Sequence, residues 1–402
     1  MRLMKRLREE PGGSEVAGLL DGITVLAVEQ AMALPYCTWR LAMDGAKVIK
    51  IEQTRGDPNR KVGARVLGEE DMCTHFLPMN VGKYGITLNL KDETGQKILR
   101  ELIQHYEIDV FACNQIPSSY EKLGVDYESL SSVRKDLIWL GISGFGLERP
   151  EAAYDPMIQA YSGLMDTNGP PESLPLRLGV SIVDMEAGNQ GYCEVIKALY
   201  HRERAGEGRR IDLSMTECAL SLLSFQLSAT SMGEKPPKSG NQHPTFAPVD
   251  VYPTKDGYVS IAVGNDTQWK SITQFPSFSS LSQDIYGTNE GRKRENDKLT
   301  YEVSAITSEH STEELIRIFR SARIPVSVVN TLEDVLVNDY LSGKLINVCD
   351  PVSGVKMKLA PPPVLASRTN GLKFTPRLGE HNAEIYGELG YNVVELRNDG
   401  VI

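Results

Sequence analysis

The sequence lacks the residue patterns that metal, redox or membrane chemistry would need. Its six cysteines are scattered through 402 residues without a C-x-x-C pair, which fits reduced thiols in a cytosolic protein better than disulfides or a zinc site. Its six histidines are isolated and form no H-E-x-x-H motif. No run approaches the ~18 apolar residues of a membrane span, and the charged N-terminus lacks the apolar segment of a secretory signal. We therefore expect a cytoplasmic protein with no metal site and no membrane contact.

Signatures of several enzyme and binding classes are also missing. No G-x-G-x-x-G follows the first predicted strand, so a dinucleotide cofactor is disfavoured, and the absence of G-x-x-x-x-G-K-[ST] excludes a P-loop nucleotide triphosphatase. The absence of G-x-S-x-G removes the usual sign of a serine hydrolase. A net charge of −10 argues against a nucleic-acid-binding protein, but it permits a local basic patch for a phosphorylated ligand.

The N-terminal third of the chain alternates short apolar runs with helix-like stretches. The runs, typical of buried parallel strands, are 23–28, 46–51, 84–90, 108–113 and 137–142. This alternation predicts an α/β fold with an open, Rossmann-like parallel sheet. Ligands of such sheets lie outside the carboxyl ends of the strands. The loops in which we expect a site therefore follow Val28, Ile51, Cys113 and Ile142.

A second, smaller α+β domain is expected in the middle of the chain. Residues 233–248 are rich in proline, glycine and lysine and indicate a loop, and 249–263 predict a hairpin with an Asp-Gly turn. The residues that follow are mainly helical and charged. We expect a loose tail at 1–17, a large α/β domain at 18–224, the small domain at 225–330 and a return to the large domain at 331–402.

The strongest candidate for chemistry lies within residues 176–214. An apolar run (178–183) precedes Asp184, and a small-residue turn (186–188) follows it. The residues from about 188 to 204 then predict a helix from their i, i+3, i+4 apolar spacing. At the mouth of a helix, backbone N–H groups and the helix dipole favour an ionised carboxylate, which can act as a nucleophile. Because Asp is also a preferred N-cap residue, a purely structural cap is the alternative.

Several loose motifs recur in a specific order and spacing along the chain. They are 20–26 with Pro35, 45–52, Asn80 with Lys83 before 86–91, Asp109 and Val110 with Asn114, 154–163, Asp184 with Gly188, 202–208 and 372–381. Together they cover about residues 18–395 and resemble the family III CoA-transferases, the group of formyl-CoA and carnitine CoA-transferases. The resemblance implies a large domain built from both chain ends and an interlocked dimer. A homodimer is expected, and a heterodimer with a homologous subunit is the alternative.

The resemblance also implies that Asp184 matches the catalytic aspartate of these enzymes. In their reaction the carboxylate attacks the thioester of a donor acyl-CoA, and the mixed anhydride is converted by the released thiolate into an aspartyl-CoA thioester. The acceptor acid then takes the CoA through a second anhydride. With an unperturbed pKa near ~3.9, Asp184 would be ionised without a general base.

Carried over by position, CoA contacts of the family fall on nine residues. These are Met32, Ala33, Leu88, Lys91, Asn114, Gln115, Lys122, Tyr154 and Asp155. Lys91 and Lys122 are candidates for binding the CoA phosphates, with solvated surface charge as the alternative for each. The CoA thioester is the substrate, and no tightly bound cofactor is expected.

Departures from the family pattern bear on the substrate. Met32 stands where formyl-CoA transferase has glutamine, and Gln53 stands where the family often has arginine, with Arg55 and Arg60 nearby. The tetraglycine loop of the formyl enzyme is missing. These changes favour an acid that is larger or less polar than formate or oxalate, for example a succinate derivative, and succinyl-CoA as donor.

Three alternatives to a CoA-transferase stay open: an acyl-CoA racemase of the same superfamily, a non-catalytic partner subunit, and a scaffold or regulatory CoA-binding module. Acyl-CoA racemases carry a Gly-His-Asp tripeptide whose histidine is one of two bases, but the matching residues here are Ala153, Tyr154 and Asp155. A tyrosine cannot readily replace that histidine, so racemisation is disfavoured. A non-catalytic partner subunit is the second alternative, and the retention of Asp184 speaks against it.

Overall fold

The computed structural model describes residues 18–149, 151–363 and 372–402. Contacts divide the described residues into two compact units: 18–149, 151–162, 179–223, 343–363 and 372–402 belong to the first, and 163–178 with 224–342 form the second. The predicted tail at 1–17 lies outside the described residues. The second unit is larger than the predicted small domain because it includes 163–178 and 331–342. The division into functional domains remains a prediction.

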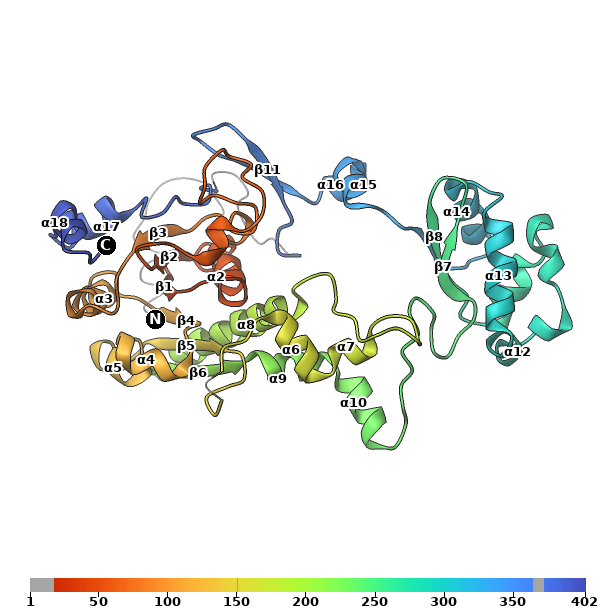
Figure 1. The fold of residues 1–402 in the computed structure, drawn as a ribbon, viewed down its shortest axis with the longest axis horizontal. Helices are drawn as coiled ribbons and strands as arrows, with labels where there is room; N and C mark the ends of the chain where they lie inside the picture. The colour runs from red at the N-terminus through yellow and green to blue at the C-terminus, as the bar shows by residue number, and fades with distance from the viewer. Residues whose placement is uncertain (1–17, 150, 364–371) are drawn as a thin grey trace. The chain divides into compact units, whose positions relative to one another are not determined.

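A parallel sheet forms the centre of the first unit (Figure 1). Its six strands lie in the order β3-β2-β1-β4-β5-β6, and every pairing is parallel. They are β1 (Thr24–Val28), β2 (Lys47–Glu52), β3 (Tyr84–Thr87), β4 (Val110–Cys113), β5 (Ile138–Ser143) and β6 (Arg209–Ser214). The predicted α/β class and parallel sheet are confirmed. The strand predicted at 84–90 ends early, at Thr87, because Asn89 and Asp92 begin the turn that leads into the next helix.

One face of the sheet is covered by helices from both ends of the chain. These are α3 (Glu93–His105), α4 (Tyr120–Leu123), α5 (Tyr127–Val133), α17 (Asn382–Glu388) and α18 (Val393–Asn398). Side chains from α3, α17 and α18 share one apolar cluster with strand residues such as Leu26 and Phe111. Figure 1 shows α17 and α18 beside β3 and α3. The contact is specific, because Asn382 Oδ1 accepts a hydrogen bond from Thr87 N at 2.9 Å.

Two helices that pack closely on each other cover the other face: α2 (Ala33–Met43) and α8 (Ile182–Ala205). A Cβ at Gly188 would lie 2.7 Å from the carbonyl oxygen of Ala33, and one at Gly191 would lie 3.3 Å from Cys37 Sγ. The small residue at 188 therefore permits helix contact and does not form a turn. The turn predicted at 186–188 is wrong, because α8 begins six residues earlier than expected, at Ile182.

The second unit contains a three-stranded antiparallel sheet, β7-β8-β9. Its strands are β7 (Val249–Pro253), β8 (Tyr258–Ala262) and β9 (Val326–Val328), and the predicted hairpin is confirmed by the β7–β8 pairing. Helices of this unit are α7 (Leu164–Thr167), α10 (Ser224–Ser231), α11 (Asp266–Ile272), α12 (Asn289–Arg294), α13 (Asn296–Thr307), α14 (Thr312–Ser321), α15 (Leu332–Val337) and α16 (Asp339–Ser342). Trp269, Phe278 and Phe319 belong to its own apolar cluster of buried side chains.

The remaining elements of the first unit are short. They are α6 (Asp155–Ser162), α9 (Met215–Leu222) and the antiparallel pair β10 (Ile346–Cys349) and β11 (Lys356–Leu359). Within the described ranges, every helix is too short or too polar to cross a membrane. The same residues contain no group of three or more His, Cys, Asp or Glu side chains arranged to hold a metal ion.

Candidate active site

Asp184 lies in the first turn of α8, and a different aspartate caps that helix. The N-cap residue, Ser181, makes no side-chain capping bond. Asp155, the first residue of α6, caps the helix instead. Its Oδ2 accepts hydrogen bonds from the backbone N–H groups of Val183 at 2.7 Å and Asp184 at 3.3 Å. Gln159 Nε2 holds the other oxygen, Oδ1. The capping interpretation of Asp184 is therefore wrong, and its carboxylate is not the group that stabilises the helix start.

The electrostatic environment of Asp184 differs from the expectation. Burial raises the pKa of its carboxyl group to about 7, and the neighbouring negative charge of Asp155 acts in the same direction. The expected pKa near ~3.9 is contradicted, because the lost hydration of the ionised form outweighs the favourable dipole of α8. The ionised fraction of Asp184 therefore changes with pH in the neutral range.

Asp184 borders a cavity of about 300 Å³ in the first unit, which we call the Asp184 cavity. Its walls come from the ends of β1, β4 and β5 and from the starts of α2 and α8, as expected for a parallel sheet. The residues that line it are Gln30, Ala31, Ala33, Asn114, Gln115, Ile116, Pro117, Ile142, Ser143, Gly144, Glu151, Ala152, Ala153, Tyr154, Asp184 and Met215. Four predicted contacts, Ala33, Asn114, Gln115 and Tyr154, thus share one cavity with Asp184.

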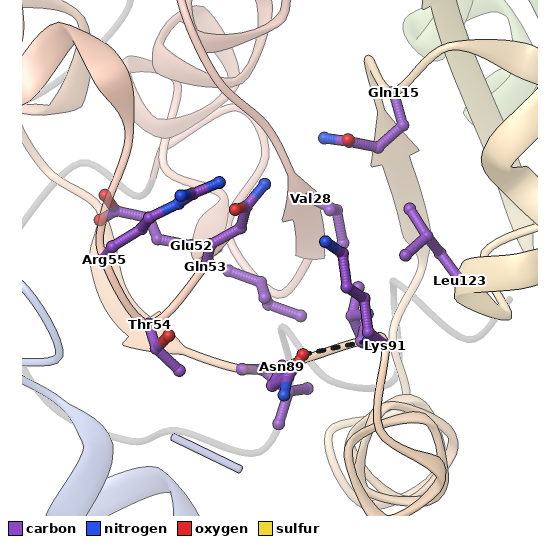
Figure 2. Close-up of a pocket in the computed structure, with 12 residues that line it drawn as sticks. Val28, Glu52, Gln53, Thr54, Arg55, Asn89, Lys91, Gln115 and Leu123 are labelled. Carbon is purple, nitrogen blue, oxygen red and sulfur yellow. Dashed lines mark hydrogen bonds between the residues drawn. The ribbon is translucent and has the colours of Figure 1, made fainter. Parts of the chain in front are cut away.

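A second cavity, of about 330 Å³, opens beyond the ends of β1, β2 and β3, and we call it the Lys91 cavity. It is lined by Val28, Ile51, Glu52, Gln53, Thr54, Arg55, Leu88, Asn89, Leu90, Lys91, Gln115 and Leu123. Figure 2 shows Arg55 and Lys91 on two sides of this space, with Gln115 at its edge. Gln115 lines both cavities. The two cavities thus lie side by side along the carboxyl ends of adjacent strands, β3 to β5. One contains the basic side chains of Arg55 and Lys91, and the other contains the carboxylate of Asp184.

Residues 20–382 of the chain match the family model of CoA-transferase family III. The chain belongs to this family. Among its relatives, the succinate–glutarate CoA-transferase of Agrobacterium fabrum is 30% identical over 384 residues, covering 92% of this chain and 95% of the relative. The succinyl-CoA:glutarate CoA-transferase of Mus musculus is 30% identical and covers 92% of this chain and 86% of the relative.

A solved structure agrees with the same assignment. The crystal structure of a CaiB/BaiF family protein from Brucella suis superposes with a TM-score of 0.83 at 31% identity. The alignment covers 93% of this chain and all of that one. The resemblance inferred from the sequence motifs is therefore confirmed, and this protein is a CoA-transferase.

Three CoA contacts predicted for this family III enzyme lie outside both cavities. Met32 is the N-cap residue of α2, next to the cavity residue Ala33. Lys122 is exposed on α4 and is not among the residues that line either cavity. Asp155 is buried, with both carboxylate oxygens accepting hydrogen bonds from the protein. As CoA contacts, these three residues remain predictions.

Asn114 lines the Asp184 cavity, but its side chain also holds the cavity wall. Its Nδ2 donates to the carbonyl oxygen of Gln30 at 2.8 Å, and its Oδ1 accepts from Gln30 N at 3.1 Å. The side-chain amide of Asn114 thus pairs with both backbone groups of Gln30, its N–H and its carbonyl oxygen, as the backbone of a neighbouring strand would. This role was not predicted, because it pairs residues that are 84 positions apart.

A buried charge cluster beneath the loop after β1 was also missed. It consists of Glu29, Lys50, Glu52, Asp57, Arg60 and Lys83, all of them buried. Lys83 Nζ donates to Glu29 Oε1 at 2.7 Å, and Lys50 Nζ donates to Asp57 Oδ2 at 2.9 Å. Burial lowers the pKa of Lys83 to about 8, although the Glu29 carboxylate opposes this change. A sign of this cluster in the sequence is a lysine within the apolar run of β2, at position 50.

Arg60 belongs to this cluster and is not available to a ligand. Its Nε and Nη2 donate to the two carboxylate oxygens of Glu52 at 2.7 and 2.6 Å, and the side chain is 1% exposed. Arg55, in contrast, is exposed and lines the Lys91 cavity. Of the two arginines near Gln53, only Arg55 can therefore contact a phosphate in this conformation.

Proposed function

We propose that this CoA-transferase moves CoA from succinyl-CoA to an acceptor carboxylic acid, with Asp184 as the covalent nucleophile. The observation that carries the proposal is the position of the Asp184 carboxylate. It borders a cavity at the strand ends, and Asp155 rather than Asp184 caps α8. A carboxylate that faces a cavity without a capping duty is suited to attack a ligand.

The reaction follows from the chemistry of a carboxylate nucleophile. An Asp184 oxygen attacks the thioester carbonyl carbon, the C–S bond breaks, and CoA leaves as a thiolate. The thiolate then attacks the aspartyl carbonyl of the mixed anhydride, which breaks the anhydride C–O bond and releases the donor acid as its carboxylate. The acceptor carboxylate attacks the carbonyl carbon of the aspartyl-CoA thioester, the C–S bond breaks, and CoA leaves again as a thiolate. This thiolate attacks the acceptor carbonyl of the second anhydride, and the C–O bond to the aspartyl oxygen breaks. Asp184 is regenerated as a carboxylate, and no net proton is consumed.

The two cavities support a placement for the CoA molecule. The Lys91 cavity offers Arg55 and Lys91 for the phosphates of the nucleotide end. Gln115, which lines both cavities, would lie beside the pantetheine arm, and the thioester would reach the carboxylate in the Asp184 cavity. The CoA contacts predicted at Leu88, Lys91, Asn114 and Gln115 are consistent with this placement.

The identity of the donor and acceptor rests on the relatives. The enzymes of Agrobacterium fabrum and Mus musculus are named for succinate or succinyl-CoA and for glutarate. These names agree with the acid larger than oxalate that Met32 favours. We therefore propose succinyl-CoA as donor and a dicarboxylic acid such as glutarate as acceptor. The interlocked dimer also stays a prediction.

The decisive test follows CoA between succinyl-CoA and a free acid by mass spectrometry. The parent enzyme should form glutaryl-CoA, and hydroxylamine should trap an adduct on Asp184 when succinyl-CoA is present. Asp184→Asn should lose transfer by at least about a thousandfold, since the amide cannot form the anhydride. Undiminished transfer by this variant would refute the role of Asp184. Loss of α-deuterium from an acyl-CoA without an acceptor would instead indicate the racemase.

A further inference from the structure

The loop that follows β1 forms one wall of the Asp184 cavity in an unusual backbone conformation. Gln30 and Ala31 line the cavity together with Asp184. Ala31 has φ 61°, in the left-handed region that residues with a side chain rarely adopt. Such a conformation persists where surrounding groups fix it, and it is concentrated at functional sites.

Two side chains from the loop after β2 bind both peptide groups of Ala31. Asn59 Nδ2 donates to the carbonyl oxygen of Ala31 at 3.0 Å. Asp57 Oδ1 accepts from the Ala31 N–H at 3.3 Å and from the Asn59 N–H at 2.9 Å. We call this arrangement of Asp57 and Asn59 around Ala31 the Ala31 clamp. With donor and acceptor both engaged, the peptide units on either side of Ala31 cannot rotate without losing a bond.

The Ala31 clamp is anchored in the interior of the sheet. Lys50 Nζ, on β2, donates to Asp57 Oδ2 at 2.9 Å, and both side chains are fully buried. Asp57 N donates to Glu52 Oε2 at 2.9 Å. The position of the clamp is thus set by buried charges. Asn59 is the one half-buried member, and its side chain reaches only the loop, so it can be changed with the anchor intact.

We propose that Asn59 is a positioning residue for CoA transfer, acting through Ala31. By holding the left-handed backbone of Ala31, Asn59 fixes the position of the loop after β1. This loop forms one wall of the cavity that Asp184 also lines. The proposal rests on the proposed function for its kinetic consequences, but the clamp itself can be measured separately. If this wall were misplaced, kcat should fall more than the affinity for the substrate falls. The reason is that the proposed site for the nucleotide end of CoA is the Lys91 cavity, away from the wall.

Replacing Ala31 separates positioning from simple fold support. Glycine adopts positive φ without steric cost, so Ala31→Gly keeps the loop conformation accessible when the clamp is weakened. If Asn59 acts by holding Ala31, the harm done by Asn59→Ala should shrink in the double variant. A residue that only stabilised the fold would show no such rescue.

The experiment compares Asn59→Ala, Ala31→Gly, the double variant and Asn289→Ala. Asn289 is a matched control because it is also half-buried and its side chain bonds two backbone groups, Thr245 O at 2.9 Å and Ala247 N at 3.1 Å. Transfer from succinyl-CoA to glutarate should fall about tenfold to a hundredfold in kcat for Asn59→Ala, with KM for succinyl-CoA within about threefold. The double variant should regain at least about a third of the parent kcat, and Asn289→Ala should stay within about twofold of it.

Amide hydrogen exchange of the loop gives a second measurement that needs no activity. Exchange at Ala31 should quicken at least about tenfold in Asn59→Ala and not in Asn289→Ala. Unchanged exchange, a kcat within about twofold of the parent, or a loss of kcat that the double variant does not recover would each overturn the proposal. If Asn59→Ala did not fold, Asn59→Leu, which keeps about the same size, lacks the donor and adds no charge beside Asp57, would be judged by the same criteria. A parent that transferred no CoA would refute the proposed function, whereas the exchange of Ala31 would still decide the clamp.

Discussion

Asp184→Asn should make the folded protein more stable, and more so at pH 8 than at pH 5. The folded-state pKa of Asp184 is raised from 3.8 to about 7, chiefly by burial. Ionising this group therefore costs the folded state more than the unfolded chain. The cost is absent below the unfolded pKa and grows as the pH rises to about 7. Asparagine has nearly the same shape and carries no charge at either pH.

The magnitude follows from the width of the pH window. Between pH 5 and the folded pKa of about 7 lie two units, and each is equivalent to about 1.4 kcal/mol. The stability difference between Asp184→Asn and the parent should thus grow by about 3 kcal/mol from pH 5 to pH 8. Asp184 is half-buried, so water reduces this value, and we expect at least about 1 kcal/mol.

Urea denaturation of both proteins at the two pH values measures this difference directly. Asp297→Asn is the control, because Asp297 is an exposed residue in the first turn of α13. It reports what loss of a charge near a helix N-terminus contributes by itself, about 0.3–1 kcal/mol of destabilisation. If Asp184→Asn were no more stable relative to the parent at pH 8 than at pH 5, the argument that burial controls Asp184 would be refuted.

Three further predictions follow from the same contacts. Lys91→Ala should raise KM for acyl-CoA about tenfold at low salt with kcat unchanged, and an unchanged KM would remove Lys91 from the phosphate site. Asp155→Asn removes a neighbouring negative charge, so the acid limb of kcat/KM, expected near pH 7 in the parent, should move to lower pH; a move to higher pH would contradict the assigned cause. Glu52→Gln leaves Arg60 buried without its full partner and should cost about 3 kcal/mol in urea denaturation, against less than about 1 kcal/mol if the pair were solvated.

The sheet could be predicted from the sequence because its strands are short apolar runs separated by helical patterns. The start of α8 could not. Its first residues, Ile182 and Val183, continue an apolar run, so the pattern favoured an extended segment before Asp184. The carboxylate of Asp155 stabilises this helix start by accepting hydrogen bonds from the N–H groups of Val183 and Asp184, which lie 28 and 29 residues away in the sequence. A local pattern does not contain such a contact.

The candidate site was predicted to a similar extent. The family resemblance indicated Asp184 and four residues of its cavity, because residues that match a family's motifs occupy the same places in the fold. It did not indicate what those side chains do to one another. The amide of Asn114 holds Gln30, and the side chain of Asn59 holds Ala31 from 28 residues away. These pairings depend on which strand ends adjoin in the sheet order, which the sequence alone did not establish.

The raised pKa of Asp184 suits the anhydride chemistry that we propose, because both depend on limited access of water to the carboxyl group. A fully exposed aspartate would be ionised at neutral pH, but an anhydride formed on it would be open to hydrolysis by water. A carboxyl group with a pKa of about 7 is ionised in about half of the molecules near neutral pH, which lowers the active fraction only about twofold. The same loss of hydration leaves the ionised half less stabilised by solvent and therefore more ready to attack a thioester. Keeping water out requires walls that do not move, so residues such as Asn59, which bind the backbone of the wall, should matter to turnover as much as residues that bind the substrate.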